Sequence, residues 1–142
     1  MIYAREYKQL TTTPLPKNMT ISKVIELGLP LDAVDRMTKI LGINKSCVAN
    51  LLSVTLCSLQ QLKKNDHGNS RLSNQLTDRA FQLTHLMNEI TETFGSQKAA
   101  VKWMNTSNIG LRDEKPLSLC NSFTGMEMVR NSVNRLKYGM TA

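Results

Sequence analysis

The sequence predicts an all-α protein, and two observations lead to this prediction. Apolar residues recur three or four positions apart in several segments, as one face of a helix requires, and no β-branched alternating run is found. The hydrophobic fraction of 41% and the charged fraction of 20% are typical of a chain that folds rather than one that stays disordered. With 142 residues the chain fits one domain, or two small helical lobes sharing one core.

The first segment, residues 1–18, shows no sustained period and contains Pro14 and Pro16 near its end. Because a residue that precedes proline avoids helical backbone, we expect an N-terminal arm here. Helical signals begin near Ser22 and pause at Gly28. They resume in a second helix, which ends at Gly42, a typical C-terminal glycine. One face of this helix is apolar and consists of Leu31, Val34, Met37 and Leu41.

A tight pair of helices is predicted next. Asn44 can cap a helix from Lys45 to Leu52, and Thr55 can cap a second helix to about Lys64. The pair meets most of the spacing of a helix-turn-helix, with small Ala49 at the helix crossing. The inward positions are apolar, namely Val48, Leu52, Val54, Leu59 and Leu62, and Ser53 stands where the turn usually has glycine. We therefore assign residues 19–72 to a helix-turn-helix DNA-binding region.

The outward residues of this pair are candidates for DNA contact. Glutamine suits adenine and lysine suits phosphate, so the candidate set is Lys45, Thr55, Cys57, Ser58, Gln60, Gln61, Lys63 and Lys64. The second helix has no arginine, although arginine to guanine is the commonest specific contact. An ordinary crossed helix pair in a bundle remains an open alternative.

The longest helix is expected over residues 73–94, with Ser73 as its cap. Its stripe of Leu76, Ala80, Leu83, Met87, Ile90 and Phe94 predicts either a buried seam or a self-association face. We expect a homodimer if DNA is bound, because two half-sites require two-fold symmetry.

Shorter helices follow the glycine at position 95. Ser96 can start one that carries Trp103, and Pro116 can take the first position of another. The last helix is predicted from Thr124 to Lys137, with Met126, Val129, Val133 and Leu136 on one face and Gly139 closing it. A lone tryptophan at helical spacing from alanines is typical of a core, so Trp103 is expected to be structural, like Ala49 and Pro116.

Catalytic, metal-binding and cofactor-binding patterns are missing from the sequence. Cys47, Cys57 and Cys120 form no C-x-x-C pair, and the glycines stand singly at element ends. Only His67 and His85 could serve as bases near neutral pH, and no recognisable nucleophile signature surrounds the three cysteines. We therefore expect that the chain has no catalytic activity and binds no metal or cofactor. A small enzyme that uses a cysteine and a histidine is the least favoured alternative.

The net charge of +7 and the pI near 9.5 favour polyanionic partners. Charged residues near the start exclude a signal peptide, and no apolar run approaches the roughly 20 residues that span a bilayer. We therefore expect a cytoplasmic protein with no membrane partner.

The C-terminal third contains short motifs in a distinctive order and spacing: Phe94-Gly95, Ala100, Trp103-Met104, Asn108, Leu111, Pro116-Leu117, Leu119, Gly125, Val129, Leu136 and Gly139. In this order and spacing the segment resembles the toxin-binding domain of the Xre/MbcA/ParS antitoxin family. The helix-turn-helix and its flanks also look like that family, so the resemblance covers about residues 20–139. There are two departures: the recognition helix lacks arginine, and Arg112 and Asp113 replace paired glycines.

The resemblance implies an antitoxin of a type II toxin–antitoxin module. Such a protein binds a RES-domain toxin that consumes NAD, blocks its active site, and represses its own operon by binding operator DNA. Residues 95–142 would form the toxin-binding domain, with contacts expected from Leu111, Arg112, Phe123, Arg130, Asn134, Lys137, Tyr138, Gly139 and Met140. The alternative is a stand-alone helix-turn-helix transcriptional regulator.

Overall fold

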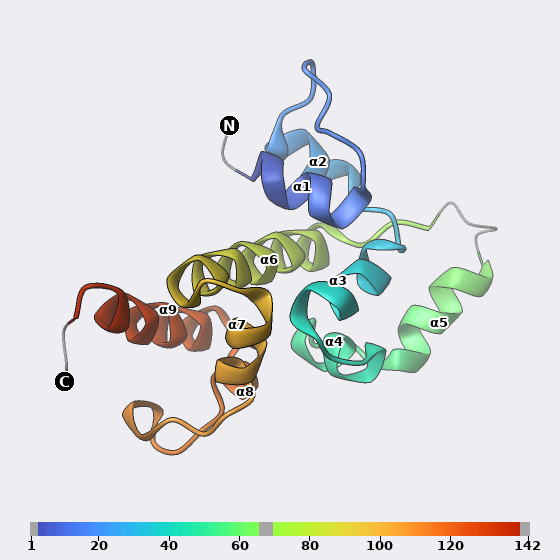
Figure 1. Ribbon diagram of the computed structural model, residues 1–142. Coiled ribbons are helices and arrows are strands. Elements are labelled where there is room, and N and C mark those ends of the chain that lie inside the picture. The colour runs from blue at the N-terminus through green and yellow to red at the C-terminus, as the bar shows by residue number, and fades with distance from the viewer. Residues whose placement is uncertain (1–2, 66–69, 140–142) are drawn as a thin grey trace. The chain divides into compact units, whose positions relative to one another are not determined.

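The computed structural model describes residues 3–65 and 70–139, without the side chains of Lys63 and Asn65 (Figure 1). The all-α prediction is confirmed. The described residues form helices joined by turns and contain no strand, only isolated bridges between Pro30 and Arg71 and between Asn108 and Glu114. The chain divides into two compact units, Met1–His85 and Leu86–Ala142. No helix of the described ranges combines the length and the apolar character needed to cross a membrane.

The described residues of the first unit form five helices and the start of a sixth. Their bounds are α1 (Ala4–Thr11), α2 (Ile21–Leu27), α3 (Ala33–Leu41), α4 (Lys45–Leu51), α5 (Leu56–Asn65) and α6 (Asn74–Phe94). The predicted caps are present, since Asn44 accepts a hydrogen bond from the Cys47 amide at 2.9 Å and Thr55 accepts one from the Ser58 amide at 3.1 Å. These caps set where α4 and α5 begin.

The expectation of an extended arm is wrong for residues 4–11, which form α1. Glu6 and Leu10, one helical turn apart, are buried with 3% and 1% exposure. The Tyr3 ring packs edge-on against Phe81 and His85 of α6, with centroids 5.9 and 5.1 Å apart. A helix too short to be stable alone is therefore held by tertiary packing, which the local sequence pattern does not reveal.

A buried polar junction joins the segment before α3 to the start of α6. The Leu72 amide donates to the Leu29 carbonyl at 2.8 Å. The Thr77 hydroxyl accepts from the Leu29 amide at 3.0 Å and donates to the Leu72 carbonyl at 3.4 Å. Gly28, at φ +86°, lies so close to the Leu72 carbonyl that a side chain would collide with it. The Thr77 hydroxyl thus forms hydrogen bonds with two backbone segments, one at Leu29 and one at Leu72.

The apolar stripe on α6 is mostly buried. Ala80, Leu83, Met87 and Ile90 are each exposed by 1% or less, and Leu76 and Phe94 are half-buried. This outcome agrees with a buried seam rather than a self-association face.

The second unit, as far as residue 139, contains the end of α6 and four further elements. These are α7 (Gln97–Met104), the short 3₁₀ helix η1 (Ile109–Leu111), α8 (Pro116–Leu119) and α9 (Phe123–Lys137). Pro116 takes the first position of α8, as predicted, and Ser122 caps α9 by accepting from the Gly125 amide at 3.0 Å. The half-buried Trp103 ring lies 5.5 Å from the Phe94 ring, joining α7 to the end of α6.

Candidate functional site

The α4–α5 pair has the backbone geometry of a sharp turn. Ser53 adopts a left-handed φ of 62°, at the position where the sequence pattern usually has glycine. Arg79 of α6 holds the turn by donating to the Ser53 hydroxyl at 3.0 Å and to the Leu51 carbonyl at 3.3 Å. Ala49 is buried at 1% exposure, which allows the two helices to approach closely. An arginine contact thus supports a turn that serine alone favours weakly.

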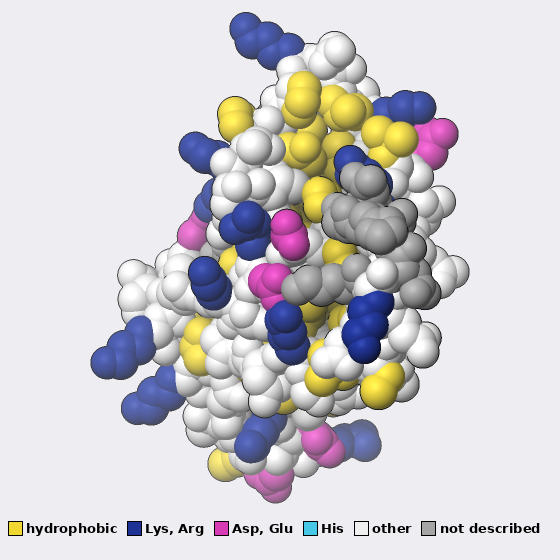
Figure 2. Space-filling view, turned by 90° about the vertical axis from the view of Figure 1, so that its right-hand side faces the viewer, with side chains coloured by type: hydrophobic (Ala, Val, Ile, Leu, Met, Phe, Trp, Pro, Cys, Tyr) yellow, Lys and Arg dark blue, Asp and Glu magenta, His cyan; other side chains and the backbone are white. Residues whose placement is uncertain are grey.

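The predicted DNA contacts on this pair are solvent-exposed where the structure describes them. The exposed residues are Lys45, Thr55, Cys57, Ser58, Gln60, Gln61 and Lys64, whereas the Lys63 side chain and His67 lie outside the described part. Lys45 is already in an ion pair, with Nζ 2.8 Å from Asp35 Oδ1. Figure 2 shows that Lys and Arg side chains are scattered singly over one face rather than gathered in one basic patch.

Leu62 does not pack inward as predicted. It is 39% exposed, whereas Leu59 is only 6% exposed. Since Leu56 is half-buried, α5 buries its apolar side mainly in its first half. The inward positions of the pattern are therefore only partly occupied by core residues.

A rigid turn presents an apolar side chain in the second unit. Ile109, the first residue of η1, is 88% exposed. The Asn108 side chain accepts from the Gly110 amide at 2.8 Å, and the Asn108 carbonyl accepts from the Asp113 amide at 2.9 Å. The Asn108 amide in turn donates to the Glu114 carbonyl at 3.1 Å, which closes the turn. These bonds hold the backbone of the turn, and the Ile109 side chain faces solvent.

The same turn contains backbone strain. Arg112 and Asp113 both have left-handed φ values, 58° and 61°, although neither is glycine. A left-handed residue other than glycine costs roughly 1–2 kcal/mol, so this conformation is held by the surrounding hydrogen bonds.

An open hollow lies between this turn and α9. It is lined by Gly110, Leu111, Met128, Asn131, Asn134 and Arg135. Leu111 is buried at 3% exposure and forms part of the floor, while Met128 is 43% exposed. The hollow therefore combines an apolar base with amide and guanidinium groups.

The structure places the predicted toxin contacts in different surroundings. Leu111 and Asn134 meet at the hollow, and Arg112, Phe123, Lys137, Tyr138 and Gly139 are exposed. Met140 lies outside the described residues. Lys137 Nζ lies 5.7 Å from the centre of the Tyr138 ring, which pairs a cation with an aromatic face at the end of α9.

Arg130 is engaged inside the second unit. Its Nε donates to Glu89 Oε1 at 3.2 Å and its Nη1 donates to Glu127 Oε1 at 2.8 Å. The Arg130 side chain is only 22% exposed. This arginine joins α9 to α6, so most of its guanidinium is occupied by the protein itself.

Sequence reasoning missed Ile109, Met128 and Asn131. An apolar residue between Asn108 and Gly110 in a polar loop is the signal that could have indicated Ile109. Met128 is outside the predicted apolar face of α9, and Leu136, predicted on that face, is 52% exposed. Two apolar residues of α9 are therefore available to a partner.

The buried thiol in this unit has a structural environment. Burial raises the pKa of Cys120 to about 12, although nearby Arg130 lowers it in part. Its Sγ donates to the Pro116 carbonyl at 3.4 Å. A thiol in this environment stays protonated at neutral pH and makes a poor nucleophile.

Comparison with known proteins gives two findings. Residues 91–139 match the family described as the antitoxin Xre/MbcA/ParS C-terminal toxin-binding domain. The chain is also 24% identical over 128 residues to a protein named antitoxin Xre from Yersinia enterocolitica, an alignment that covers 89% of this chain and 84% of the relative. The matched segment contains η1, α8 and α9 and therefore the whole hollow.

Proposed function

From its confirmed similarity to the Xre/MbcA/ParS antitoxins, we propose that this chain neutralises the toxin of a type II toxin–antitoxin module. The toxin is a RES-domain protein that degrades NAD, and this chain, in the cytoplasm, covers the toxin's active site without any catalytic activity of its own. The observation that carries this proposal is the exposed apolar surface formed by Ile109, Met128 and the hollow, inside the segment that matches a toxin-binding domain.

The chemistry of this surface suits a protein partner. Interfaces are anchored by a few large side chains that enter pockets, surrounded by a polar rim. Hydrogen bonds hold the backbone of the turn around Ile109 before any partner binds, so little loop entropy is lost on association. Arg112 and Arg135 add positive charge around it. A toxin surface that has an apolar pocket with acidic groups beside it would complement this arrangement.

Operator binding is the second part of the proposal. It is supported by the cap at Thr55, the left-handed Ser53 and the exposed polar residues along α5. With no arginine, such a helix would draw most of its affinity from phosphate contacts. We propose that a homodimer binds two half-sites and represses transcription of its own operon.

Co-expression tests the toxin part directly. The reading frame adjacent to this gene should arrest growth when expressed alone, and this chain should restore growth and co-purify with its product. Ile109→Asp should abolish the rescue, because a buried carboxylate would replace the anchor. Leu27→Asp is the matched control, since Leu27 is an apolar residue of the first unit that is 49% exposed.

Failure of the wild-type chain to rescue growth or form a complex would refute the toxin proposal. If Ile109→Asp and Leu27→Asp lose rescue equally while both proteins are folded, the surface around Ile109 is not the specific toxin interface. Light scattering of the free chain reports whether it is a dimer.

DNA binding is tested separately with a fragment of the promoter region. Affinity should fall steeply as salt rises, and Lys64→Ala should reduce the slope of log affinity against log salt by roughly one. Lys98→Ala, an exposed lysine of α7, should leave the slope unchanged. DNA binding without any stable protein partner would instead favour a stand-alone transcriptional regulator.

A further inference from the structure

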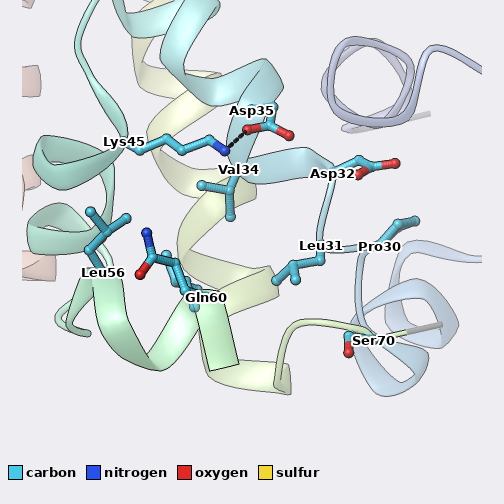
Figure 3. Close-up of a pocket in the computed structure, with 10 residues that line it drawn as sticks. Pro30, Leu31, Asp32, Val34, Asp35, Lys45, Leu56, Gln60 and Ser70 are labelled. Atoms are coloured by element: carbon cyan, nitrogen blue, oxygen red, sulfur yellow. Dashed lines mark ion pairs between the residues drawn. The ribbon is translucent and has the colours of Figure 1, made fainter. Parts of the chain in front are cut away.

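A pocket lies in the first unit, between the segment that leads into α3 and the first half of α5 (Figure 3). Its aliphatic wall consists of Leu31, Val34, Leu56 and Leu59. Val34 and Leu59 are 5% and 6% exposed, and the other two leucines are half-buried. In Figure 3, Leu31 and Val34 project into the space from one side and Leu56 faces them from the other. The pocket is therefore an apolar space between two packed elements.

The charged groups around this pocket favour a neutral occupant. Lys45 Nζ lies 2.8 Å from Asp35 Oδ1, and this ion pair stands at one edge of the space in Figure 3. The Asp32 carboxylate points away from Leu56 and Gln60 and so away from the aliphatic wall. A charged ligand would lose its hydration here without gaining an opposite charge that is still unpaired. A neutral ligand pays no such cost.

One polar group remains available at the opening. The Gln60 amide lies beside Leu56 at the edge of the space, and no described residue forms a hydrogen bond with it (Figure 3). A side-chain amide can both donate and accept. The Ser70 hydroxyl, which also lines the pocket, already donates to the Leu62 carbonyl. Gln60 is thus the group that can bind a hydroxyl on a ligand.

The volume of the pocket restricts the size of the ligand. It measures about 120 Å³. Apolar cavities of roughly 150 Å³ accept a benzene molecule. A single ring with a short polar substituent directed to the opening fits this space, whereas a nucleotide or a peptide segment does not.

We propose that this pocket binds a small neutral aromatic alcohol, with its ring against the aliphatic wall and its hydroxyl on the Gln60 amide. Lys45 and Gln60 line the pocket and are also proposed DNA contacts. A bound ligand occupies the Gln60 amide and lowers the affinity for operator DNA. This last consequence rests on the proposed operator binding, whereas binding of the ligand itself does not.

Benzyl alcohol is a suitable probe because it joins one ring to one hydroxyl. Titration of the full chain, followed by backbone amide NMR shifts, should show saturable changes at Leu31, Val34, Leu56 and Gln60. The expected dissociation constant is on the order of 1 mM, as for a ligand of few atoms. Benzylamine and benzoate have nearly the same size but carry a charge, and each should bind roughly fivefold or more weakly.

Matched variants test the position of the ligand. Gln60→Trp should close the pocket and abolish binding, whereas Gln61→Trp, at a neighbour that does not line the pocket, should bind as wild type. Gln60→Ala should weaken binding by roughly two- to tenfold, the loss of one hydrogen bond, and Gln61→Ala should leave it unchanged. Asp32→Asn should also leave it unchanged, because that carboxylate points away from the space.

Circular dichroism of each variant establishes that it is folded before binding is compared. Absence of saturable shifts with the wild-type protein would overturn the proposal. So would benzylamine or benzoate binding as tightly as benzyl alcohol, or an equal response of the Gln60 and Gln61 variants.

The effect on DNA is measured with the promoter fragment. Saturating benzyl alcohol should lower the affinity of the wild-type chain for DNA by roughly two- to tenfold and leave that of Gln60→Trp unchanged. Unchanged affinity in the wild type would refute the coupling to DNA. If the chain binds no promoter DNA at all, operator binding fails, and the NMR titration still decides whether the pocket binds its ligand.

Discussion

Gly125 of α9 lies directly against the carbonyl oxygen of Leu119 at the end of α8, with no room for a side chain between them. Gly125→Ala should therefore destabilise the protein by about 1–3 kcal/mol, because a backbone atom cannot move aside as a flexible side chain can. Elsewhere in a helix the same change would stabilise by up to about 1 kcal/mol. Urea unfolding measures the difference.

Gly110→Ala is the control for this prediction. Its added carbon would meet only the Asn108 side-chain oxygen, at 3.2 Å. The cost should stay below about 1 kcal/mol, since that side chain can shift. A similar loss of stability at both positions would contradict the close approach of α8 and α9.

Arg130 and Arg135 should behave in opposite ways. Arg130→Ala removes the ion pairs to Glu89 and Glu127 and should cost about 1–3 kcal/mol, because both glutamates are partly buried. Arg135→Ala leaves those contacts intact and should change stability by less than about 0.5 kcal/mol, yet weaken binding of the toxin partner. Thermal unfolding and a binding titration with the purified partner separate the two effects.

The left-handed turn gives a stabilising prediction. Arg112→Gly should raise the free energy of unfolding by up to about 1 kcal/mol, because glycine adopts φ 58° without strain. Lys115→Gly, at a position with φ −74°, should instead lower it by a similar amount. If Arg112→Gly proves destabilising, the arginine side chain contributes more to the turn than its backbone strain costs.

Thiol reactivity should divide the cysteines into two classes. Cys47 and Cys57 are exposed and should react quickly with a thiol reagent at pH 8, whereas Cys120 should react only after unfolding. With its pKa raised to about 12, the Cys120 thiolate fraction at that pH is on the order of 10⁻⁴. Rapid reaction of three thiols in the folded protein would contradict this assignment.

The same pKa shift predicts how stability depends on pH. Because Cys120 keeps its proton longer in the folded chain, its contribution is intact below its ordinary pKa of 9.0 and is lost as pH rises towards about 12. In that window wild type should lose stability faster than Cys120→Ala by up to about 1.4 kcal/mol per pH unit. Urea unfolding of both proteins at pH 8 and pH 10 measures this difference.

Local sequence signals predicted most helix ends correctly. Asn44, Thr55 and Ser96 begin helices because their side chains accept amide hydrogen bonds three residues later, a rule that acts within one turn. The same local reasoning failed for α1, whose stability comes from α6 residues far along the chain. Periodicity identified α9 but not which of its apolar residues are buried.

The candidate interface was harder to predict than the fold. The apolar spacing along α9 predicted that Leu136 is buried and did not include Met128, although the structure exposes both side chains. Burial of a helix face depends on which neighbours cover it, and short helices such as η1 and α8 cover only part of α9. An apolar residue in a polar loop could have indicated Ile109, but the sequence does not reveal the hydrogen bonds across the turn that hold its backbone.

The hydroxyl of Thr77 limits which residues evolution can place at that position. Serine would keep both hydrogen bonds, to the Leu29 amide and the Leu72 carbonyl, but would leave a void the size of a methyl group. Valine would fill the space and leave a buried amide without its acceptor. Position 77 should therefore be among the least permissive in a saturation library, even though it lies on the surface of neither candidate interface.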